Sequence, residues 1–139
     1  MISSPFLQNG IQMDNLVKNF LEQKHFAVIG SFRHEKKYAY QILKSLMNNG
    51  YKVYPVNSRF REIEGLPCYS SVKDIPVVCD VANIVTPPVV SEKIVKQCRD
   101  KGINKIWLQP GAESENVIKF CEQNNLEVIY NLCVMLENH

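Results

Sequence analysis

Residues 26–31 read Phe-Ala-Val-Ile-Gly-Ser, four apolar side chains in a row followed by a glycine and a serine. A continuous apolar run of this length is typical of a strand that is buried on both faces. Such strands occur in parallel sheets whose two sides are covered by helices. We therefore predict that this run is the first strand of an α/β domain.

Helical and extended patterns alternate along the rest of the chain. An apolar stripe with helical spacing occupies residues 38–49 and ends at Asn-Asn-Gly. The other predicted strands are at 51–56, 77–85, 106–108 and 126–130. Helices are predicted at 88–101, with Pro88 or Ser91 as the start, and at 113–124, and a long loop at 57–71 leads into a turn at 72–75. This alternation predicts a Rossmann-like, doubly wound sheet of five parallel strands in the order 3-2-1-4-5, with helices on both faces.

A separate amphipathic pattern precedes the first strand. Apolar residues recur near helical spacing from Ile11 to Leu21 and predict a helix over residues 11–23. We divide the chain into this N-terminal extension, 1–23, and the Rossmann-like domain, 24–139. The helix is expected to pack on the domain or on a partner subunit, so a homodimer is one expectation.

The composition argues against several classes of protein. The 16 Lys and Arg residues nearly balance the 14 Asp and Glu residues, and the formal net charge is +2. Nucleic-acid and membrane-surface proteins need a more concentrated basic face. The chain also lacks an apolar run long enough to span a membrane and a signal-peptide pattern at its start. We expect a cytoplasmic protein that binds neither nucleic acid nor membrane.

The cysteines and histidines form no recognisable chemical motif. The five cysteines contain no CxxC pair, which fits neither a disulfide framework nor a zinc knuckle. No Ser or Cys nucleophile is evident beside a histidine, so we predict neither a catalytic residue nor a metal site. Cys133 follows the last predicted strand and is the one thiol considered for redox chemistry, although an ordinary core cysteine is the alternative interpretation.

The turn after the first strand carries the best candidate for phosphate binding. Ligands of doubly wound sheets bind where the carboxyl ends of the strands meet. Backbone amides from Gly30 and Ser31 and the start of the following helix can face a pyrophosphate, and Arg33 and Lys37 add positive charge. The GxGxxG fingerprint is absent. A tight turn with solvated surface charges is therefore the alternative interpretation.

The turns after the other strands narrow the choice of ligand. Asn57-Ser58-Arg59 lacks the acidic residue that holds the ribose of NAD. Arg59 instead suits a ribose phosphate, as in NADP or coenzyme A, unless it is a plain loop arginine. Thr86-Pro87-Pro88 is expected to form a rigid wall for an adenine or a pantetheine arm, unless it only ends the strand and starts the next helix. Gln109 to Ala112 is expected to complete the crevice.

Several short motifs follow one another in a characteristic order along residues 25–137. They are Gly30-Ser31, Gly50-Tyr51, Pro55-Val56-Asn57, Ile63-Glu64-Gly65, Tyr69, Asp74-Ile75-Pro76, Trp107-Leu108-Gln109 with Gly111, and Asn131-x-Cys133 with Glu137. In this order and spacing the chain resembles the CoA-binding domain family, small Rossmann-like proteins related to the CoA-binding domain of succinyl-CoA synthetase. It differs at Gly30-Ser31-Phe32, where the family commonly has Gly-Ala-Ser, and at Val134, where the family has proline.

The resemblance implies non-catalytic binding of coenzyme A or an acyl-CoA at the same edge of the sheet. The pyrophosphate is then expected near residues 30–33 and the adenosine near residues 57–59. The predicted cofactor site comprises Gly30, Ser31, Phe32, Arg33, Lys37, Pro55, Val56, Asn57, Arg59, Thr86, Pro87, Gln109 and Gly111.

Two other functions stay open. One is a small NADP-dependent reductase or a thiol-based CoA redox enzyme that uses Cys133, and it requires a substrate cleft. The other is an interaction domain without a ligand. Phe32 favours this interaction domain, because a large side chain in the turn proposed to bind phosphate narrows the space for a ligand.

Overall fold

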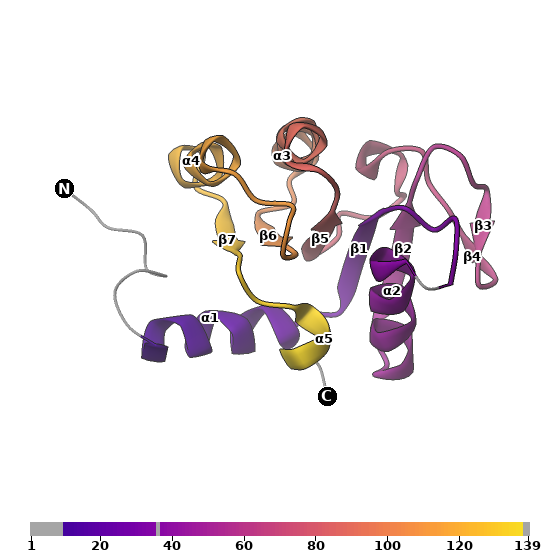
Figure 1. The fold of residues 1–139 in the computed structure, drawn as a ribbon, viewed down its shortest axis with the longest axis horizontal. Coiled ribbons are helices and arrows are strands. Elements are labelled where there is room, and N and C mark those ends of the chain that lie inside the picture. Colours follow the sequence, from indigo (N-terminus) through magenta and orange to yellow (C-terminus); the bar gives the residue numbers. More distant parts are fainter. Residues whose placement is uncertain (1–9, 36, 138–139) are drawn as a thin grey trace.

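The computed structural model describes residues 10–35 and 37–137 of the chain. Its main sheet consists of β1 (His25–Gly30), β2 (Lys52–Val56), β5 (Val81–Val85), β6 (Lys105–Leu108) and β7 (Glu127–Ile129), all parallel. One face is covered by α1 (Gly10–Leu21), α2 (Tyr38–Asn48) and α5 (Val134–Glu137), and the other by α3 (Pro88–Lys101) and α4 (Glu115–Gln123) (Figure 1). The predicted doubly wound α/β fold is confirmed.

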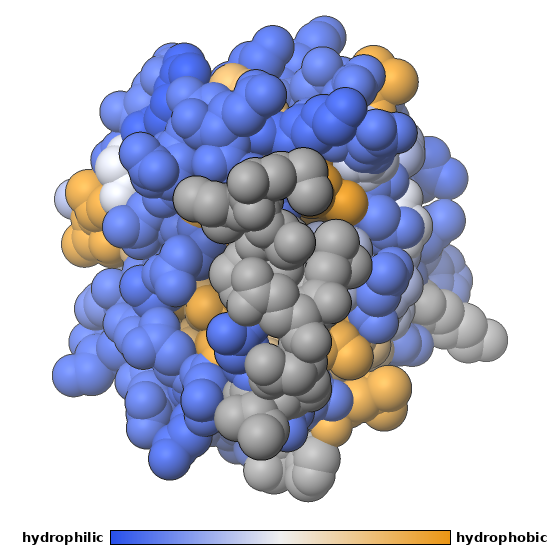
Figure 2. All heavy atoms as spheres, turned by 90° about the vertical axis from the view of Figure 1, so that its left-hand side faces the viewer, coloured by the Kyte–Doolittle hydropathy of each residue, from blue (hydrophilic) through white to orange (hydrophobic). Residues whose placement is uncertain are grey.

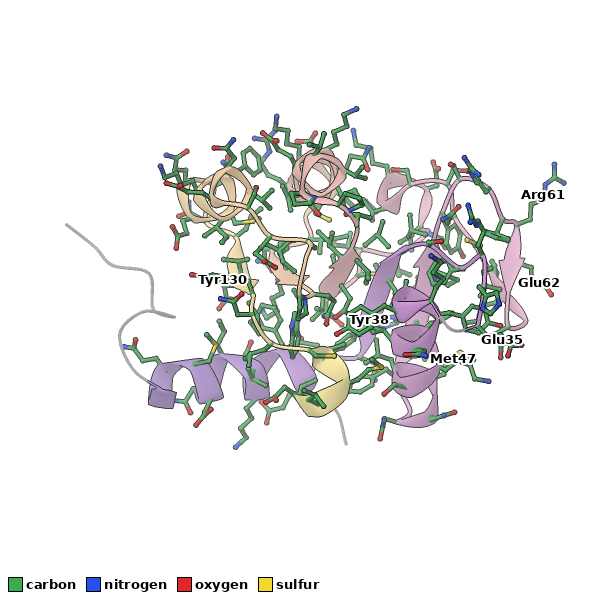
Figure 3. The ribbon with its side chains drawn as sticks, in the orientation of Figure 1. Glu35, Tyr38, Met47, Arg61, Glu62 and Tyr130 are labelled. Atoms are coloured by element: carbon green, nitrogen blue, oxygen red, sulfur yellow. The ribbon has the colours of Figure 1, made fainter. Side chains whose placement is uncertain are left out.

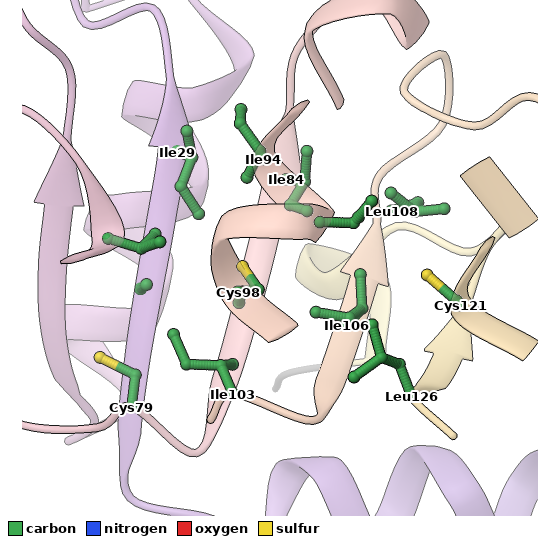
Figure 4. Close-up of a cluster of buried hydrophobic side chains, with 14 of the residues drawn as sticks. Ile29, Cys79, Ile84, Ile94, Cys98, Ile103, Ile106, Leu108, Cys121 and Leu126 are labelled. Carbon is green, nitrogen blue, oxygen red and sulfur yellow. The ribbon is translucent and has the colours of Figure 1, made fainter. Parts of the chain in front are cut away.

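The apolar run of β1 contributes to two separate cores, because successive side chains point to opposite faces of a sheet. Phe26 and Val28 are buried in the cluster beneath α1 and α2. Ala27 and Ile29 are buried in the cluster beneath α3 and α4, part of which Figure 4 shows. This two-sided burial is the physical reason for the continuous apolar run.

The strand order differs from the prediction. The sheet has the order β2-β1-β5-β6-β7, so the third main strand pairs with β1 and not with β2. The predicted order placed the second strand between two neighbours, but this strand contains Pro55, which has no N–H to donate. Proline within a sheet is confined mainly to edge strands. The outer side of β2 is instead met by Tyr69, whose N–H donates to the Pro55 carbonyl at 2.9 Å.

The predicted loop at 57–71 contains a small hairpin. Its strands, β3 (Glu62–Ile63) and β4 (Leu66–Pro67), are antiparallel, and a 3-10 turn follows at Val72–Asp74. The third main strand is also shorter than predicted. It begins at Val81. Val77 and Val78, which were predicted to lie at its start, are exposed, with 37% and 53% of their surface accessible to solvent.

Helix α1 packs on its own domain. Val17 and Phe20 are buried, and the rings of Phe20 and Trp107 pack in a T-shaped arrangement with centroids 6.1 Å apart. The Tyr51 hydroxyl donates to the Leu21 carbonyl at 2.6 Å. The surface at the end of the molecule where α1 begins is mainly hydrophilic with separate hydrophobic groups (Figure 2). The homodimer stays a prediction, as does the division at residue 23.

None of the helices within residues 10–35 and 37–137 has the length and apolar character that crossing a membrane requires.

Candidate functional site

The candidate site lies where β1 and β5 end side by side. From β1 the chain continues into α2 on one face, and from β5 it continues into α3 on the other face (Figure 1). This divergence is the switch point at which doubly wound sheets bind ligands. The corrected strand order therefore moves the turn at Thr86 next to the turn at Gly30 and places Gln109 one strand further away.

Gly30 is required by packing at this switch point. A Cβ atom at Gly30 would lie 2.6 Å from the Ala39 Cβ and 2.9 Å from the Val85 carbonyl oxygen. Both distances are too short for atoms that are not bonded, so α2 and β5 leave no room for a side chain. The next residue, Ser31, is exposed.

Three exposed cations follow the first two strands. Arg33 and Lys37 belong to the connection from β1 to α2, and Arg59 follows β2. Within the described ranges none of the three takes part in an ion pair. Arg61 is exposed as well and extends away from the protein beside β3 (Figure 3). The edge therefore offers positive charge that no ion pair within the described part of the chain neutralises.

Asn57 connects the turn after β1 with the turn after β2. Its Nδ2 donates to the Gly30 carbonyl at 2.7 Å, and its Oδ1 accepts from the Arg59 N–H at 2.8 Å. Its own N–H donates to the Tyr69 carbonyl at 2.9 Å. The segment that carries Arg59 is thereby held against the end of β1.

The turn after β5 adds a small apolar surface. The hydroxyls of Thr86 and Ser91 are 2.8 Å apart and fix the start of α3. Pro87 is exposed, and so are Val89 and Val90, at 72% and 42%. The apolar spacing of Val89 with Ile94 and Val95 predicts that Val89 lies on the buried stripe of this helix. This prediction is wrong, because the first turn of α3 leaves the Val89 side chain in solvent.

Residues 24–139 match the family model described as the CoA binding domain. The chain belongs to the CoA-binding domain family. It is 34% identical to the acetate–CoA ligase (ADP-forming) of Methanocaldococcus jannaschii over 83% of this chain and 18% of the ligase. The chain thus spans about a fifth of that relative's length.

Two solved structures have the same fold as this CoA-binding domain. A conserved hypothetical protein from Pyrococcus furiosus is 40% identical, with a TM-score of 0.79 over 82% of this chain and 98% of that one. A hypothetical protein from Pyrococcus horikoshii is 27% identical, with a TM-score of 0.86 over 99% of this chain and 94% of that one. The match to whole small proteins shows that the fold also occurs as a separate chain.

Several residues of the predicted cofactor site are buried in the CoA-binding domain. Phe32 is 3% exposed and packs in the cluster beneath α1 and α2, and Pro55 and Val56 are buried in β2. Gln109 is fully buried, with its Nε2 donating to Asn83 Oδ1 at 3.1 Å and its Oε1 accepting from the Val134 N–H at 3.0 Å. Its amide joins β5, β6 and α5, so the structure gives Gln109 a clear structural role.

Gly111 lies in the exposed turn before α4 and has a φ of 96°. Its N–H donates to Glu113 Oε1 at 3.0 Å. A left-handed φ favours glycine, so the turn itself accounts for this residue. Contact of either Gln109 or Gly111 with a ligand stays a prediction.

A contact between Tyr38 and Cys133 was not foreseen from the sequence. The hydroxyl of Tyr38, a residue labelled at the start of α2 in Figure 3, donates to the sulfur of Cys133, just before α5. Burial and this hydrogen bond raise the pKa of Tyr38 above its usual value. Both residues are half-buried, and 95 positions separate them in the chain.

Three other cysteines lie in the core, where their thiols are shielded from solvent. Cys79, Cys98 and Cys121 are buried, and burial raises the pKa of the Cys79 and Cys121 thiols to about 12. Among the described residues no three His, Cys, Asp or Glu side chains are grouped so that they can hold a metal ion.

Two surface pockets lie outside the candidate site at the carboxyl edge of the main sheet. One, of about 500 Å³, is bounded by the outer side of α2 and by Glu64, and the other, of about 400 Å³, runs along the outer side of β2 beneath Tyr69. Neither is lined by Gly30, Arg33 or Arg59. We place the candidate site at the edge because the unpaired cations and the switch point are there.

Proposed function

We propose that this chain binds coenzyme A or an acyl-CoA at the carboxyl edge of the sheet and does not itself transform it. The pyrophosphate lies near the turn from Gly30 to Arg33, and the ribose phosphate lies near Arg59. The pantetheine arm follows the exposed apolar surface of Pro87, Val89 and Val90. Membership of the CoA-binding domain family supports this class of ligand.

The observation that carries the proposal is the group of exposed cations beside the switch point. Coenzyme A presents a pyrophosphate and a ribose phosphate, and guanidinium groups bind phosphate oxygens through paired hydrogen bonds. Arg33, Lys37 and Arg59 form no ion pair within the described ranges and are exposed. These cations can therefore meet a ligand without first breaking a salt bridge.

Binding of CoA, and not ligation of acetate, is the property that we transfer from the relatives to this chain. The chain matches the family model described as the CoA binding domain, and it aligns with 18% of the length of the ligase. A CoA site accounts for the matched part. The cytoplasmic location expected for such a protein stays a prediction.

Isothermal titration of the reduced protein with CoA, NADP and NAD tests the proposal. We expect saturable binding of CoA, and Arg33→Ala or Arg59→Ala should each weaken it by at least about tenfold, since hydrogen bonds to charged groups contribute about 1.5–3 kcal/mol. Lys93→Ala, which removes an exposed cation from α3, is the matched control and should leave binding unchanged. Binding of NADP without CoA would favour the reductase, and binding of none of the three would favour the interaction domain.

A thiol reaction of Cys133 is the second candidate function, and the contact with Tyr38 is the observation that favours it. This hydrogen bond holds the Cys133 sulfur in a fixed position beside the start of α2. The Cys133 thiolate would attack one sulfur of CoA disulfide, form a mixed disulfide and release the other CoA as its thiolate. No further oxidant is needed for this exchange.

Mass spectrometry after incubation with CoA disulfide tests this second function. We expect a mass increase of one CoA that Cys133→Ser abolishes. Cys68→Ser removes the other half-buried thiol and is the matched control, because it should leave the adduct intact. An unmodified protein, or an adduct that Cys133→Ser retains, contradicts the thiol reaction.

A further inference from the structure

Every polar group of Asn57 has a partner within the protein. Its side-chain amide donates to Gly30 and accepts from Arg59, as described above. Its N–H donates to the Tyr69 carbonyl, and its carbonyl accepts a hydrogen bond from the Cys68 thiol at 3.5 Å. The residue is half-buried. Asn57 is therefore built into the junction between the two turns, whereas Arg59 is exposed.

We propose that Asn57 is a positioning residue that directs Arg59 toward the ribose phosphate of the ligand. It thereby determines the preference for CoA over an analogue that lacks this phosphate. This inference rests on the proposed function. It assigns Asn57 a role through Arg59, where the sequence suggested a direct contact with the ligand.

The geometry of the turn supports this role. An asparagine side chain that accepts from the N–H two residues later closes an Asx turn, which fixes the backbone of the residue that donates. Here that residue is Arg59, and the donor atom is its N–H at 2.8 Å. The second bond, from Nδ2 to Gly30, ties the same turn to the end of β1, where the pyrophosphate is proposed to lie. One amide thus sets the distance between the two phosphate-binding turns.

The choice of asparagine follows from the two bonds. The side chain must donate to a carbonyl oxygen and accept from an N–H, and an amide does both. An aspartate could accept but not donate. A serine can still accept from the N–H two residues later, more weakly, but is too short to span to the neighbouring turn. The inference therefore predicts different outcomes for alanine and for serine at position 57.

The test compares the affinities for CoA and for dephospho-CoA, which lacks the ribose phosphate. We expect the wild-type protein to prefer CoA about tenfold, as one charge-assisted contact allows. Arg59→Ala should abolish this preference. Asn57→Ala should abolish it too, although Arg59 is still present, and the double variant should show no further loss of preference. The preference, not the affinity alone, is the measurement that separates positioning from a general structural effect.

Two further variants keep the test decisive. Asn57→Ser should retain part of the preference, and it decides the question if thermal melting shows that Asn57→Ala does not fold. Asn116→Ala removes an exposed asparagine from α4 and should behave as the wild type. An Asn57→Ala protein that binds both nucleotides more weakly but keeps its preference overturns the inference alone, and so does a wild-type protein without any preference. A wild-type protein that binds neither nucleotide overturns the proposed function, and the inference with it.

Discussion

The turn after β1 and the turn after β2 end neighbouring strands of the same sheet, yet different forces hold them. The first is fixed by packing, because Phe32 is buried and Gly30 has no space for a Cβ atom. The second is fixed by hydrogen bonds, because Asn57 holds the backbone of Arg59, whose side chain is in solvent. Packing against the core therefore makes the first turn rigid. The second turn depends on the hydrogen bonds of one side-chain amide, that of Asn57, which joins it to the first turn.

This difference has a consequence for the effects of mutation. Substitutions in a packed turn disturb the core and should lower the stability of the whole domain. Substitutions in a hydrogen-bonded surface turn should act locally, since surface regions open with smaller free energies than the core. The four predictions below test this contrast, beginning with the largest expected effect.

Phe32→Ala should have the largest effect. The side chain is 3% exposed and lies in the core beneath α1 and α2, and removal of a buried phenylalanine side chain costs about 3–5 kcal/mol. Urea denaturation measures the loss, and Phe32→Leu, which keeps most of the apolar volume, is the control with a smaller loss. A Phe32→Ala protein that is as stable as the wild type and binds CoA more tightly would instead show that this ring narrows the phosphate pocket.

Gly30→Ala should have the next largest effect on stability. The added methyl group meets the Ala39 Cβ at 2.6 Å and a backbone oxygen at 2.9 Å, and overpacking of this kind costs about 1–3 kcal/mol. Ala39→Gly in the same protein should restore part of the loss, since it removes the first of the two clashes. Ser31→Ala, one residue away and exposed, should change the unfolding midpoint little. Equal midpoints for Gly30→Ala and the wild type would contradict the packing argument.

The sequence was sufficient for the layers of the fold but not for the strand order. Apolar runs such as residues 26–29 identify buried strands, and their alternation with helices fixes the class of sheet. The side of β1 that the third strand joins depends on contacts between elements, which periodicity does not record. Pro55 was the available clue to an edge strand. The hairpin of β3 and β4 was missed because strands of two residues have no detectable period.

The candidate site was predictable to the same extent. Gly30, Arg33 and Arg59 could be assigned to one edge because they lie at or after strand ends, and all strand ends of a parallel sheet share one edge. Their contact with a ligand stays a prediction. The bond from the Asn57 side chain to Gly30 and the contact of Tyr38 with Cys133 depend on three-dimensional distances between remote residues. No spacing rule connects such residues, so these features required the structure.

Asn57→Ala should loosen the second turn locally. Loss of the bond to the Arg59 N–H should speed its hydrogen exchange by a factor that corresponds to about 1 kcal/mol, while global stability falls less than in Gly30→Ala. Hydrogen exchange followed by mass spectrometry of peptides that cover residues 57–61 measures the effect, and peptides from 26–29 serve as the internal reference. Faster exchange in both peptides would mean that Asn57 supports the core as well.

The hairpin of β3 and β4 follows the second turn along the chain. Its Glu64 binds to two side chains of α2, and this contact should depend on pH. Its carboxylate accepts from the Tyr40 hydroxyl and from Lys44 Nζ, the latter at 2.9 Å. The bond from Tyr40, followed by that from Lys44, lowers the pKa of Glu64 below the usual 4.5, and the same bond raises the pKa of Tyr40 to about 12. A carboxyl group with a lowered folded pKa adds stability above its unfolded pKa and loses it as the pH falls through the folded value.

Glu64→Gln should therefore have the smallest effect, and one that acid removes. At about pH 7 the variant should be slightly less stable than the wild type in urea. The difference should shrink as the pH falls below the usual 4.5 and through the lowered folded pKa of Glu64, because the wild-type carboxylate then becomes protonated. Glu62→Gln, in the same hairpin and exposed, controls for the loss of one negative charge. A difference that stays constant across this range would mean that the hairpin is held by the burial of Ile63 and not by the carboxylate. In that case packing, and not hydrogen bonding, would hold this hairpin, as it holds the first turn.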